Sequence, residues 1–430
     1  MHRPKTEGST ARVGRLRYFS VLALALALNA AFWAFALATG PSGLPLRRVA
    51  AEFLSTSAVV LMSANAVIST RPFVLDRLFG GLDKLFIAHR TDGLAVAVVV
   101  IGHFSLMPQS PGWFLGKVIG YTNITLVLVS IALAIAPRSP WRRLVPMRYN
   151  VWKAFHRFMG VFLALAVVHS LVNHPIILAL PVARTWVYSM ATLGLLAYAY
   201  RELAERFVRE RHRYTVAKVH HPADDIVEVE LEPVASPLAF RSGQFAFVRF
   251  RGGPSREQHP FTISAAPSND GHLRFSIKAS GDYTRALQSH LDRGSMARVE
   301  GPYGCFDYRR GRARQLWLAG GIGITPFLAF LGDAELDYDV QLVWVVRNGQ
   351  EAPYRDEIEA ALLKHPHVRF EIRASAAQGH LRVADLGIAR PQEISAFVCG
   401  PVPMRKAFAE QLEELGVARR EIYYEEFGLR

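Results

Sequence analysis

The stretch LFIAHRTDGLAVAVVVIGHFSL, from Leu85 to Leu106, combines a long apolar run with two histidines, His89 and His103. About 20 mostly apolar residues are enough to cross the hydrocarbon core of a bilayer as a helix. The first half of the chain holds five further runs of this kind, near residues 17–39, 51–70, 118–136, 154–173 and 182–200. The sequence therefore predicts a multi-domain membrane protein with a six-helix transmembrane bundle in residues 17–210, after a tail of residues 1–16.

The first apolar run could also be a cleaved signal peptide, because it follows a basic tail and ends in ALATG. Its apolar part is longer than such a signal usually has, which favours a first helix. Basic residues concentrate in the linker before the fifth run, whereas the linkers of the opposite face carry chiefly Arg47 and Arg48. Since positively charged linkers stay in the cytoplasm, we expect both termini and the C-terminal half on the cytoplasmic side.

The distribution of charge argues against a nucleic-acid partner, and the cysteine content argues against disulfides and cysteine-based metal sites. The 430 residues carry a formal net charge of +14, and 51% of them are hydrophobic. No cluster of Lys and Arg interleaved with aromatic residues stands out in the C-terminal half, so no nucleic-acid partner is expected. Only two cysteines occur, Cys305 and Cys399. We therefore expect neither a disulfide nor a cysteine-based metal site.

The C-terminal half changes from short strands to alternating strands and helices. From residue 214 to about 308, short strands are broken by Gly and Pro, which is typical of a small antiparallel β-barrel. From about residue 314, strands alternate with helices, which indicates an α/β domain with a parallel sheet. We place the barrel in residues 211–312 and the Rossmann-like α/β domain in residues 313–430.

The fifth apolar run, HRFMGVFLALAVVHSLVNH, adds His156, His169 and His174 to the two histidines of the third run. Any one of them could simply bond to a neighbouring helix, but a matched set at membrane depth favours function. Neutral imidazole is an axial ligand of haem iron. The 14-residue step in the third run rises about 21 Å, and the 13-residue step in the fifth about 20 Å. We expect His89 with His156 to hold one haem near the cytoplasm, and His103 with His169 another near the outside.

The positions of the histidines around the fifth helix do not decide whether His169 or His174 is the second outer ligand. The step from His156 to His169 turns about 140°, whereas the step to His174 returns to the same face but rises about 27 Å. Depth favours His169, and we expect a bend near Gly160 to supply the rotation. Zinc and di-iron sites need ligands one turn apart or converging at one level. A proton relay of histidines is the remaining alternative.

Two groups of motifs in the C-terminal half predict nucleotide binding. HPFT, at residues 259–262, precedes SGDYTRAL, where Gly281 opens a helix whose free N–H groups suit a pyrophosphate. With GPYG at residues 301–304, these motifs indicate a flavin nucleotide. LWLAGGIGITPFLAFL is a strand, a glycine turn and a helix, and FVCGPVPM ends a later strand. This context predicts a nicotinamide dinucleotide at the glycine turn.

Taken together, the spaced histidines, HPFT, GPYG, GGIGITP, CGP and the terminal aromatic residue closely resemble the ferric reductase and NADPH oxidase superfamily, particularly its bacterial members. The resemblance covers nearly the whole chain apart from the first twenty residues. It implies FAD, two b-type haems and NADPH or NADH as cofactors. It also implies a bacterial inner membrane location and no obligatory protein partner.

The resemblance assigns roles to individual residues. The flavin would be held by His259, Pro260, Phe261 and Thr262, with Lys278 and Thr284 at its diphosphate. The dinucleotide would lie on Gly320, Gly321, Gly323 and Thr325, and its nicotinamide near Cys399, Gly400 and Pro401. Soluble relatives usually have Arg where His259 stands. Phe427 resembles the aromatic residue that stacks on the isoalloxazine ring, although it could simply end a strand. Arg347 and Arg373 could meet a 2′-phosphate, because arginine suits bidentate phosphate binding; this favours NADPH.

The resemblance implies a path for electrons from cytoplasmic NADPH through FAD and two haems to an acceptor on the outer face. We expect oxygen to be the acceptor, giving superoxide. Ferric-chelate reduction is the alternative, because Met107 stands where eukaryotic oxidases commonly have a histidine. An alternative of another class is a non-enzymatic electron conduit for a partner protein. An ion or proton transporter that uses the histidines is a third.

Overall fold

The computed structural model describes residues 10–79, 81–108, 111–135, 149–173, 175–205, 212–254, 258–348 and 352–425. They fall into two compact units. One consists of Met1–Phe79 and Lys84–Arg209 and is helical. The other consists of Gly80–Asp83 and Glu210–Arg430 and contains all the described strands.

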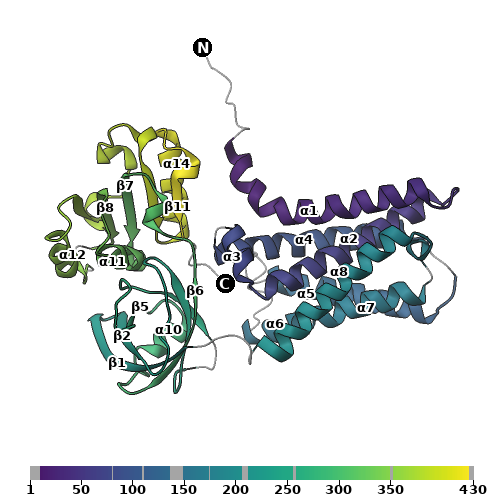
Figure 1. Ribbon diagram of the computed structural model, residues 1–430, viewed down its shortest axis with the longest axis horizontal. Helices are drawn as coiled ribbons and strands as arrows, with labels where there is room; N and C mark the ends of the chain where they lie inside the picture. Colours follow the sequence, from purple (N-terminus) through teal and green to yellow (C-terminus); the bar gives the residue numbers. More distant parts are fainter. Residues whose placement is uncertain are drawn as a thin grey trace, which may run out of the picture. The chain divides into compact units, whose positions relative to one another are not determined.

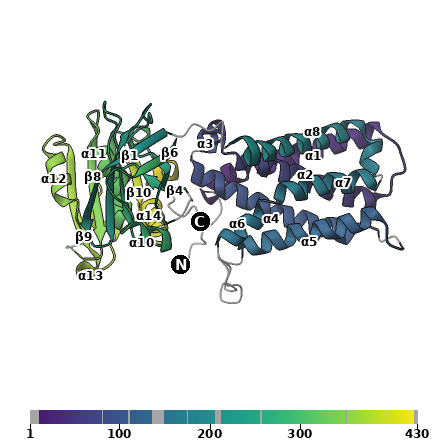
Figure 2. The same ribbon diagram turned by 90° about the horizontal axis from the view of Figure 1, so that it is seen from below.

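Six helices of more than ten residues make up most of the helical unit as described, and their axes are roughly aligned, with neighbours in sequence running in opposite directions (Figures 1 and 2). They are α1 (Thr10–Thr39), α2 (Leu46–Ser69), α4 (Leu82–Leu106), α5 (Leu115–Ile135), α7 (Met159–Val172) and α8 (Pro181–Ala199). Shorter segments join or extend them: α3 (Phe73–Phe79), α6 (Tyr149–His156), the 3-10 helix η3 (Ile176–Ala179) and the π-helix η4 (Tyr200–Ala204).

Four of the expected six transmembrane helices are long and apolar enough to cross a membrane, among the described residues. They are Leu46–Ser69, Lys84–Leu106, Leu115–Ile135 and Trp152–Val172. The apolar part of α1 is shorter, Ala23–Thr39. Helix α8 carries Arg184, Thr185 and Ser189, which lower its hydropathy. The six-helix prediction is therefore supported for four helices. The basic linker that we used to predict topology, with Arg138, Arg142 and Arg143, lies outside the described residues.

The helices pack unequally. Helix α2 lies close to α1 and α8, and α5 lies close to α7, whereas α4 makes only sparse backbone contact with the other described helices. Polar bonds reinforce the α1–α2 contact, since Asn29 Nδ2 donates to Ser57 Oγ at 2.9 Å and Trp33 Nε1 donates to Thr56 Oγ1 at 3.0 Å. Such interhelical bonds stabilise helix pairs in lipid, where no hydrophobic force drives association. Helix α4 contacts its neighbours through side chains instead, since Val96 belongs to the buried core of the unit.

A two-residue turn interrupts the helical span Trp152–Val172 of the fifth apolar run. Helix α6 ends at His156 and α7 begins at Met159, so that Arg157 and Phe158 form a turn between them. Phe158 has ψ near 0°, which is not helical. The interruption lies two residues before Gly160, close to the predicted bend. It places His156 and His169 on separate helices.

The first half of the second unit is the predicted antiparallel barrel. Its six strands follow the order β4-β3-β6-β1-β2-β5. The strands are β1 (His212–Ala223), β2 (Ile226–Pro233), β3 (Phe245–Phe250), β4 (His259–Thr262), β5 (Leu273–Lys278) and β6 (Met296–Tyr303). The short helix α10 (Asp282–Leu287) follows β5. Strand β3 places Phe245, Ala246, Val248 and Phe250 in the interior, which fixes β4 and its HPFT residues beside the barrel core.

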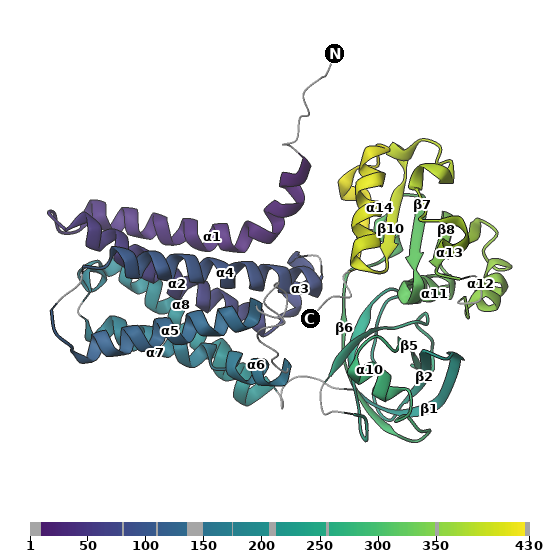
Figure 3. The same cartoon turned by 180° about the vertical axis from the view of Figure 1, so that it is seen from behind.

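The second half is the predicted α/β domain. Its parallel sheet has the order β11-β10-β7-β8-β9. The strands are β7 (Arg314–Gly320), β8 (Asp339–Val346), β9 (Val368–Ala374), β10 (Ser395–Cys399) and β11 (Ile422–Tyr424). Strands β7 and β10 are buried on both faces, as parallel sheets require. Helix α14 (Val402–Glu414) packs on one face, and α11 (Thr325–Leu331) and α12 (Arg355–Leu362) on the other (Figure 3).

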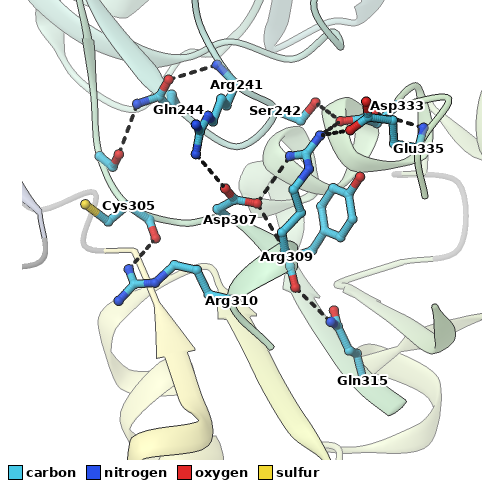
Figure 4. Close-up of polar contacts among 12 residues, drawn as sticks. Arg241, Ser242, Gln244, Cys305, Asp307, Arg309, Arg310, Gln315, Asp333 and Glu335 are labelled. Carbon is cyan, nitrogen blue, oxygen red and sulfur yellow. Dashed lines mark hydrogen bonds and ion pairs between the residues drawn. The ribbon is translucent and has the colours of Figure 1, made fainter. Parts of the chain in front are cut away.

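A cluster of charged and polar side chains joins the barrel to the α/β domain (Figure 4). Arg309, between β6 and β7, contacts Asp307 at 3.3 Å and Asp333 at 2.5 Å. Ser242, which precedes β3, donates to the same Asp333 carboxylate at 2.9 Å. Ser242 is fully buried and Asp333 nearly so. Because buried carboxylates are costly unless paired, these bonds hold the two domains in one arrangement.

Candidate functional site

One histidine of the third apolar run and one of the fifth lie with their rings face to edge. The ring centroids of His89 on α4 and His156 on α6 are 6.0 Å apart, at an interplanar angle of 83°. When two imidazoles bind the same metal ion from opposite sides, each at about 2 Å, their ring centres lie about 6 Å apart. The indole of Trp152 stacks on the His156 ring at 5.4 Å. The spacing of this pair suits a shared metal ion.

The second pair shows the ring orientation that metal ligands need. His103 Nδ1 lies 2.9 Å from the carbonyl oxygen of Ala51, and His169 Nδ1 lies 2.8 Å from that of Gly116. A carbonyl only accepts, so Nδ1 of His103 donates its proton and leaves Nε2 with a lone pair. Nδ1 of His169 faces both the Gly116 carbonyl and the amide nitrogen of Asn173, 3.0 Å away. Metal-bound histidines usually make such a second bond, which fixes their tautomer. The Nδ1 bond of His103 therefore orients its Nε2 in the way that a metal ligand needs.

His169 lies in a tight groove of small residues. A Cβ on Gly120 of α5 would overlap Cε1 of His169, and a Cβ on Gly116 would overlap the Asn173 amide. That amide donates to the His169 carbonyl at 2.7 Å and lies 3.0 Å from Nδ1. This G-x-x-x-G spacing of Gly116 and Gly120 is a known signal for close helix packing, and it is visible in the sequence. His174, the alternative ligand, lies outside the described residues.

Two buried polar groups near the start of α4 deserve comparison with the residues around them, His89 Nδ1 and the carboxylate of Asp92. His89 Nδ1 is buried and forms no hydrogen bond within the described chain, although the Asn65 carbonyl lies close enough to interact with the ring. Asp92, one turn along α4, is 0% exposed, and neither of its carboxylate oxygens has a partner among the described residues. An acidic residue inside an apolar run is a functional signal that the sequence analysis missed. Buried polar groups of this kind fit a site for a polar ligand or a bound cofactor.

The HPFT residues lie along the barrel edge. His259 is buried, and its ring stacks on Tyr283 of α10 with centroids 3.6 Å apart. Thr262 is only 5% exposed, and its hydroxyl has no hydrogen-bond partner in the described part of the chain. Pro260 and Phe261 are half-buried. A buried hydroxyl without a partner fits a polar ligand edge, such as that of a flavin ring.

The two residues expected at the flavin diphosphate already have protein partners. Lys278 Nζ forms an ion pair with Asp225 at 3.0 Å. Thr284 Oγ1 accepts from the Gly281 N–H at 2.9 Å and from the Ser280 N–H at 3.0 Å. The Thr284 hydroxyl thus caps α10. Contact of either side chain with a diphosphate would require these bonds to be shared or exchanged.

Four glycines bring the turns after β7 and β10 into contact. A Cβ on Gly323 would overlap the carbonyl of Cys399, and one on Gly320 would overlap the Met404 side chain. Gly400 has φ of +156°, and Gly321 has φ of +52° with open space where a Cβ would stand. The turns lie at the carboxyl ends of neighbouring parallel strands, where open α/β sheets bind ligands. Thr325 is buried and donates to the Ile322 carbonyl at 3.1 Å, so that it closes the turn.

Cys399 lies beside buried charged residues that the sequence analysis missed. Burial raises the pKa of the Cys399 thiol well above its usual value, and the charge of Glu425 adds to this, whereas Arg405 opposes it. Arg405 and Glu425 are 5% and 6% exposed. The guanidinium of Arg405 also lies 4.9 Å from the centre of the Tyr424 ring. Glu425 stands two residues before Phe427, which lies outside the described residues.

The remaining predicted residues flank these turns. Pro401 precedes α14 and sets its start. Arg347 is exposed directly after β8, whereas Arg373 Nε pairs with Glu371 at 2.6 Å. Of the two arginines, Arg347 is therefore the one exposed at a strand end. A strand edge with close-packed glycines and a thiol kept neutral is suited to hold a dinucleotide and its nicotinamide ring.

Comparison with known proteins identifies the two domains of the second unit. Residues 211–307 match the FAD-binding domain family, and residues 317–410 match the oxidoreductase NAD-binding domain family. The chain is 27% identical over 265 residues to the reductase component of propane 2-monooxygenase from Rhodococcus jostii, covering 57% of this chain and 71% of that one. It is 30% identical over 246 residues to a flavohemoprotein from Pseudomonas aeruginosa, covering 54% of this chain and 62% of that one.

A solved structure shares the fold. The flavohemoglobin of Malassezia yamatoensis aligns with 90% of this chain and 100% of its own, with a TM-score of 0.51 and 20% identity. The chain spans about three fifths of the flavohemoprotein that it matches in sequence. Residues 211–410 carry an FAD-binding domain and an NAD-binding domain, and the protein is an oxidoreductase that transfers electrons from NAD(P)H through FAD. One relative is by name a reductase component, which counts against our expectation that no protein partner is obligatory.

Proposed function

We propose that this ferredoxin reductase-like oxidoreductase is a transmembrane flavocytochrome of the ferric reductase and NADPH oxidase type. It passes electrons from cytoplasmic NADPH through FAD and two b-type haems to oxygen on the outer face of a bacterial inner membrane. The observation that carries the proposal is the His89–His156 pair, with ring centroids 6.0 Å apart, on an apolar helix and its neighbour. A chain with an FAD-binding and an NAD-binding domain has a ready source of electrons for such a pair.

The residues of the second unit bind the two nucleotides and orient their reactive rings. Gly320, Gly321 and Gly323 let a dinucleotide backbone approach the sheet edge, and Cys399 adds a neutral group beside the nicotinamide. Thr262 offers its free hydroxyl to the flavin edge. Bound FAD would supply the conversion of two-electron hydride chemistry to single-electron transfer, and bound haem would supply reversible one-electron storage. Coenzyme preference for NADPH is part of the proposal, with Arg347 at the 2′-phosphate.

The residues of the helical unit hold the two haems at different depths. His89 and His156 bind the first, and His103 and His169 the second, each of these latter rings steered by its Nδ1 bond. At the end of α4 beyond His103, Arg47 Nε donates to the Leu106 carbonyl at 2.9 Å. This positive charge suits an anionic product or an anionic iron chelate equally. Ferric-chelate reduction is therefore the second candidate, favoured by Met107 in place of a histidine.

The purified chain in detergent tests the proposal. We expect one flavin and two haems per chain, a reduced-minus-oxidised spectrum of the b type, and haem reduction by NADPH under nitrogen. With air, about two superoxide molecules should form per NADPH, because a hydride carries two electrons and each superoxide takes one. Ferric citrate reduction without superoxide would move the assignment to a ferric reductase.

Three other outcomes would reject the proposal. A chain with both haems that does not oxidise NADPH would be an electron conduit for a partner. A chain that oxidises NADPH but needs an added protein acceptor would resemble a reductase component. A chain without a Soret band would carry no haem, and the histidines would serve another purpose, such as proton transfer.

A further inference from the structure

The polar residues that join the barrel to the α/β domain lie close in sequence to the nucleotide motifs. Asp307 and Arg309 follow the GPYG motif at residues 301–304, and Asp333 follows α11, the helix that begins at the glycine turn. Ser242 precedes β3, the strand that pairs with β4 and its HPFT residues. Each member of the joint is therefore tied by a short length of chain to a segment expected at the flavin or at the dinucleotide.

The guanidinium of Arg309 connects these segments (Figure 4). It pairs with Asp307 of its own segment at 3.3 Å and with Asp333 of the α/β domain at 2.5 Å. The Asp333 carboxylate also accepts a hydrogen bond from Ser242 Oγ of the barrel at 2.9 Å. Asp333 is only 8% exposed, and bonds shielded from water are strong and directional. One buried carboxylate thus receives donors from two separate segments.

A second set of bonds continues from the joint to the flavin motifs. Gln244 Nε2 donates to the carbonyl of Gly304, the last residue of GPYG, at 3.2 Å. The Gln244 carbonyl accepts from the N–H of Ile263, the residue after HPFT, at 3.0 Å. Gln244 Oε1 accepts from the Arg241 N–H at 2.8 Å, which fixes the side chain. Gln244 stands two positions after Ser242, so one short loop contacts the joint and both flavin motifs.

The same loop packs against the helix of the glycine turn without spare room. Gly243 has φ of +89°, and a Cβ there would lie 2.1 Å from the Phe306 carbonyl oxygen and 2.5 Å from the Phe330 ring of α11. Directly after α11, a Cβ on Gly332 would lie 3.2 Å from the Cβ of Ala266, which follows β4. Closely packed interiors transmit small displacements because they compress little. A change in the joint should therefore shift the barrel relative to α11.

We propose that Arg309 is a positioning residue for hydride transfer, which holds the flavin motifs of the barrel at a fixed distance from the glycine turn of the α/β domain. In this step a hydride, one proton with two electrons, leaves C4 of the dihydronicotinamide and binds to N5 of the flavin, so that NAD(P)H is oxidised and FAD is reduced. Arg309 acts through Asp333 and α11, not by contact with either ring. A misplacement of about 1 Å can cost about 100-fold in rate. The transfer takes place in the second unit, so this role does not depend on the haems.

A joint of this kind could instead serve stability alone, and the two roles predict different behaviour. When a purely structural joint is broken, the unfolding temperature falls, but the molecules that remain folded react at their usual rate. When a positioning joint is broken, hydride transfer slows in folded molecules that have bound both nucleotides. The rate must therefore be measured at saturating NADPH, where binding no longer limits it.

The test uses the full-length chain in detergent. Bleaching of the flavin absorbance is followed under nitrogen after rapid mixing with saturating NADPH, and the Kd of NADP+ is measured separately. We expect Arg309→Gln to reduce the flavin roughly tenfold or more slowly, with a Kd within about twofold of the parent. Arg309→Lys keeps the charge but not the planar fork, so it should recover part of the rate. Ser242→Ala removes one donor to Asp333. It should show a smaller loss in the same direction, and it is the test variant where Arg309→Gln does not fold.

The matched control is Arg314→Gln, at the start of β7. Arg314 pairs with Asp339 at 3.6 Å and with Glu393 at 3.8 Å, and all three residues belong to the α/β domain. The substitution therefore removes ion pairs of the same kind and leaves the joint to the barrel intact. Its rate of flavin reduction should stay within about twofold of the parent.

A second readout measures the arrangement of the domains without any reaction. Spin labels are attached to Glu232→Cys on β2 and Leu363→Cys after α12, two exposed positions, in a chain with Cys305→Ser. We expect one narrow distribution of label distances in the parent and a shifted or broader one in Arg309→Gln. An unchanged rate at saturating NADPH in both Arg309→Gln and Ser242→Ala would overturn the proposal. A slow rate with an unchanged distance distribution would overturn it as well.

Discussion

Individual residues of this protein show how burial changes chemical behaviour. The hydroxyl of Thr262 is buried without a hydrogen-bond partner in the described part of the chain. The thiol of Cys399 is buried near the charge of Glu425. At Gly323 there is no room for a Cβ atom. The sequence motifs indicated that HPFT, GGIGITP and CGP bind nucleotides. They could not show Glu425 or Arg405 beside Cys399, because these residues come from separate segments that only the fold brings together.

At Gly323, we expect substitution to damage the fold itself. In Gly323→Ala the new methyl group would overlap the Cys399 carbonyl and lie 2.9 Å from the Gly400 Cα. Overpacking against backbone costs about 1–3 kcal/mol, so thermal unfolding of the flavin-loaded chain should occur several degrees lower. Gly321→Ala has open space around its Cβ but a φ of +52°. The left-handed backbone should cost only about 1–2 kcal/mol, and the variant should mainly raise the KM for NADPH. Equal loss of stability in both variants would contradict this account.

For Cys399, we expect poor reactivity at neutral pH. Burial raises the pKa of its thiol, so the reactive thiolate is scarce and becomes populated only as pH rises towards the raised pKa. Cys305 is partly exposed. Iodoacetamide at pH 7 should therefore label Cys305 and spare Cys399, as read by mass spectrometry of peptides, and unfolding in urea should expose both. Labelling of Cys399 in the folded chain at pH 7 would refute the assignment.

At the level of elements, α4 and the fifth apolar run carry the histidines of the proposed haem sites. The sequence correctly predicted long apolar helices and, near Gly160, a departure from a straight helix. It could not show that α6 and α7 are separate, because a turn at Arg157 and Phe158 has no proline or glycine signal. It also could not reveal the close approach of α5 to His169, since that contact depends on three-dimensional packing.

Gly120 gives a prediction about the outer haem. In Gly120→Ala the methyl group would overlap the His169 ring and displace it, so the haem content should fall from two towards one per chain. Gly93→Ala in α4 is the control, because nothing lies within 4 Å of its Cβ. It should leave haem content unchanged and stabilise α4 by about 0.5–1 kcal/mol. The pyridine haemochromogen assay and thermal unfolding measure the two effects. An unchanged haem count in Gly120→Ala would exclude His169 as a ligand and turn attention to His174.

At the scale of the whole molecule, the chain consists of two units with different tasks. The second unit holds both nucleotide domains, which Arg309, Asp333 and Ser242 join. The barrel and the α/β domain could be predicted from strand and helix patterns, because each pattern has its own period. The bonds among Arg309, Asp333 and Ser242 could not be predicted, because these residues come from three separate segments of the sequence.

A truncated chain that starts at Glu210 should fold and keep the first half of the reaction. We expect it to bind FAD and to reduce ferricyanide with NADPH at a rate close to that of the full chain, because the domains that match the FAD-binding and NAD-binding families lie in the second unit. It should show no Soret band. Arg309→Gln in this fragment should lower the unfolding temperature by several degrees, because it leaves the Asp333 carboxylate without its arginine, at a cost of about 1–3 kcal/mol. A fragment that does not oxidise NADPH would refute the claim that the second unit alone carries out this half of the reaction.

The turn that separates α6 from α7 has a consequence for assembly. His156 ends α6 and His169 lies on α7, with a two-residue turn between them, so under the proposed function we expect each porphyrin to bind without the other. Half-filled molecules should therefore be stable enough to isolate when iron porphyrin is scarce in the growth medium. A cell short of haem would accumulate such precursors in its membrane and could complete them later without making new polypeptide.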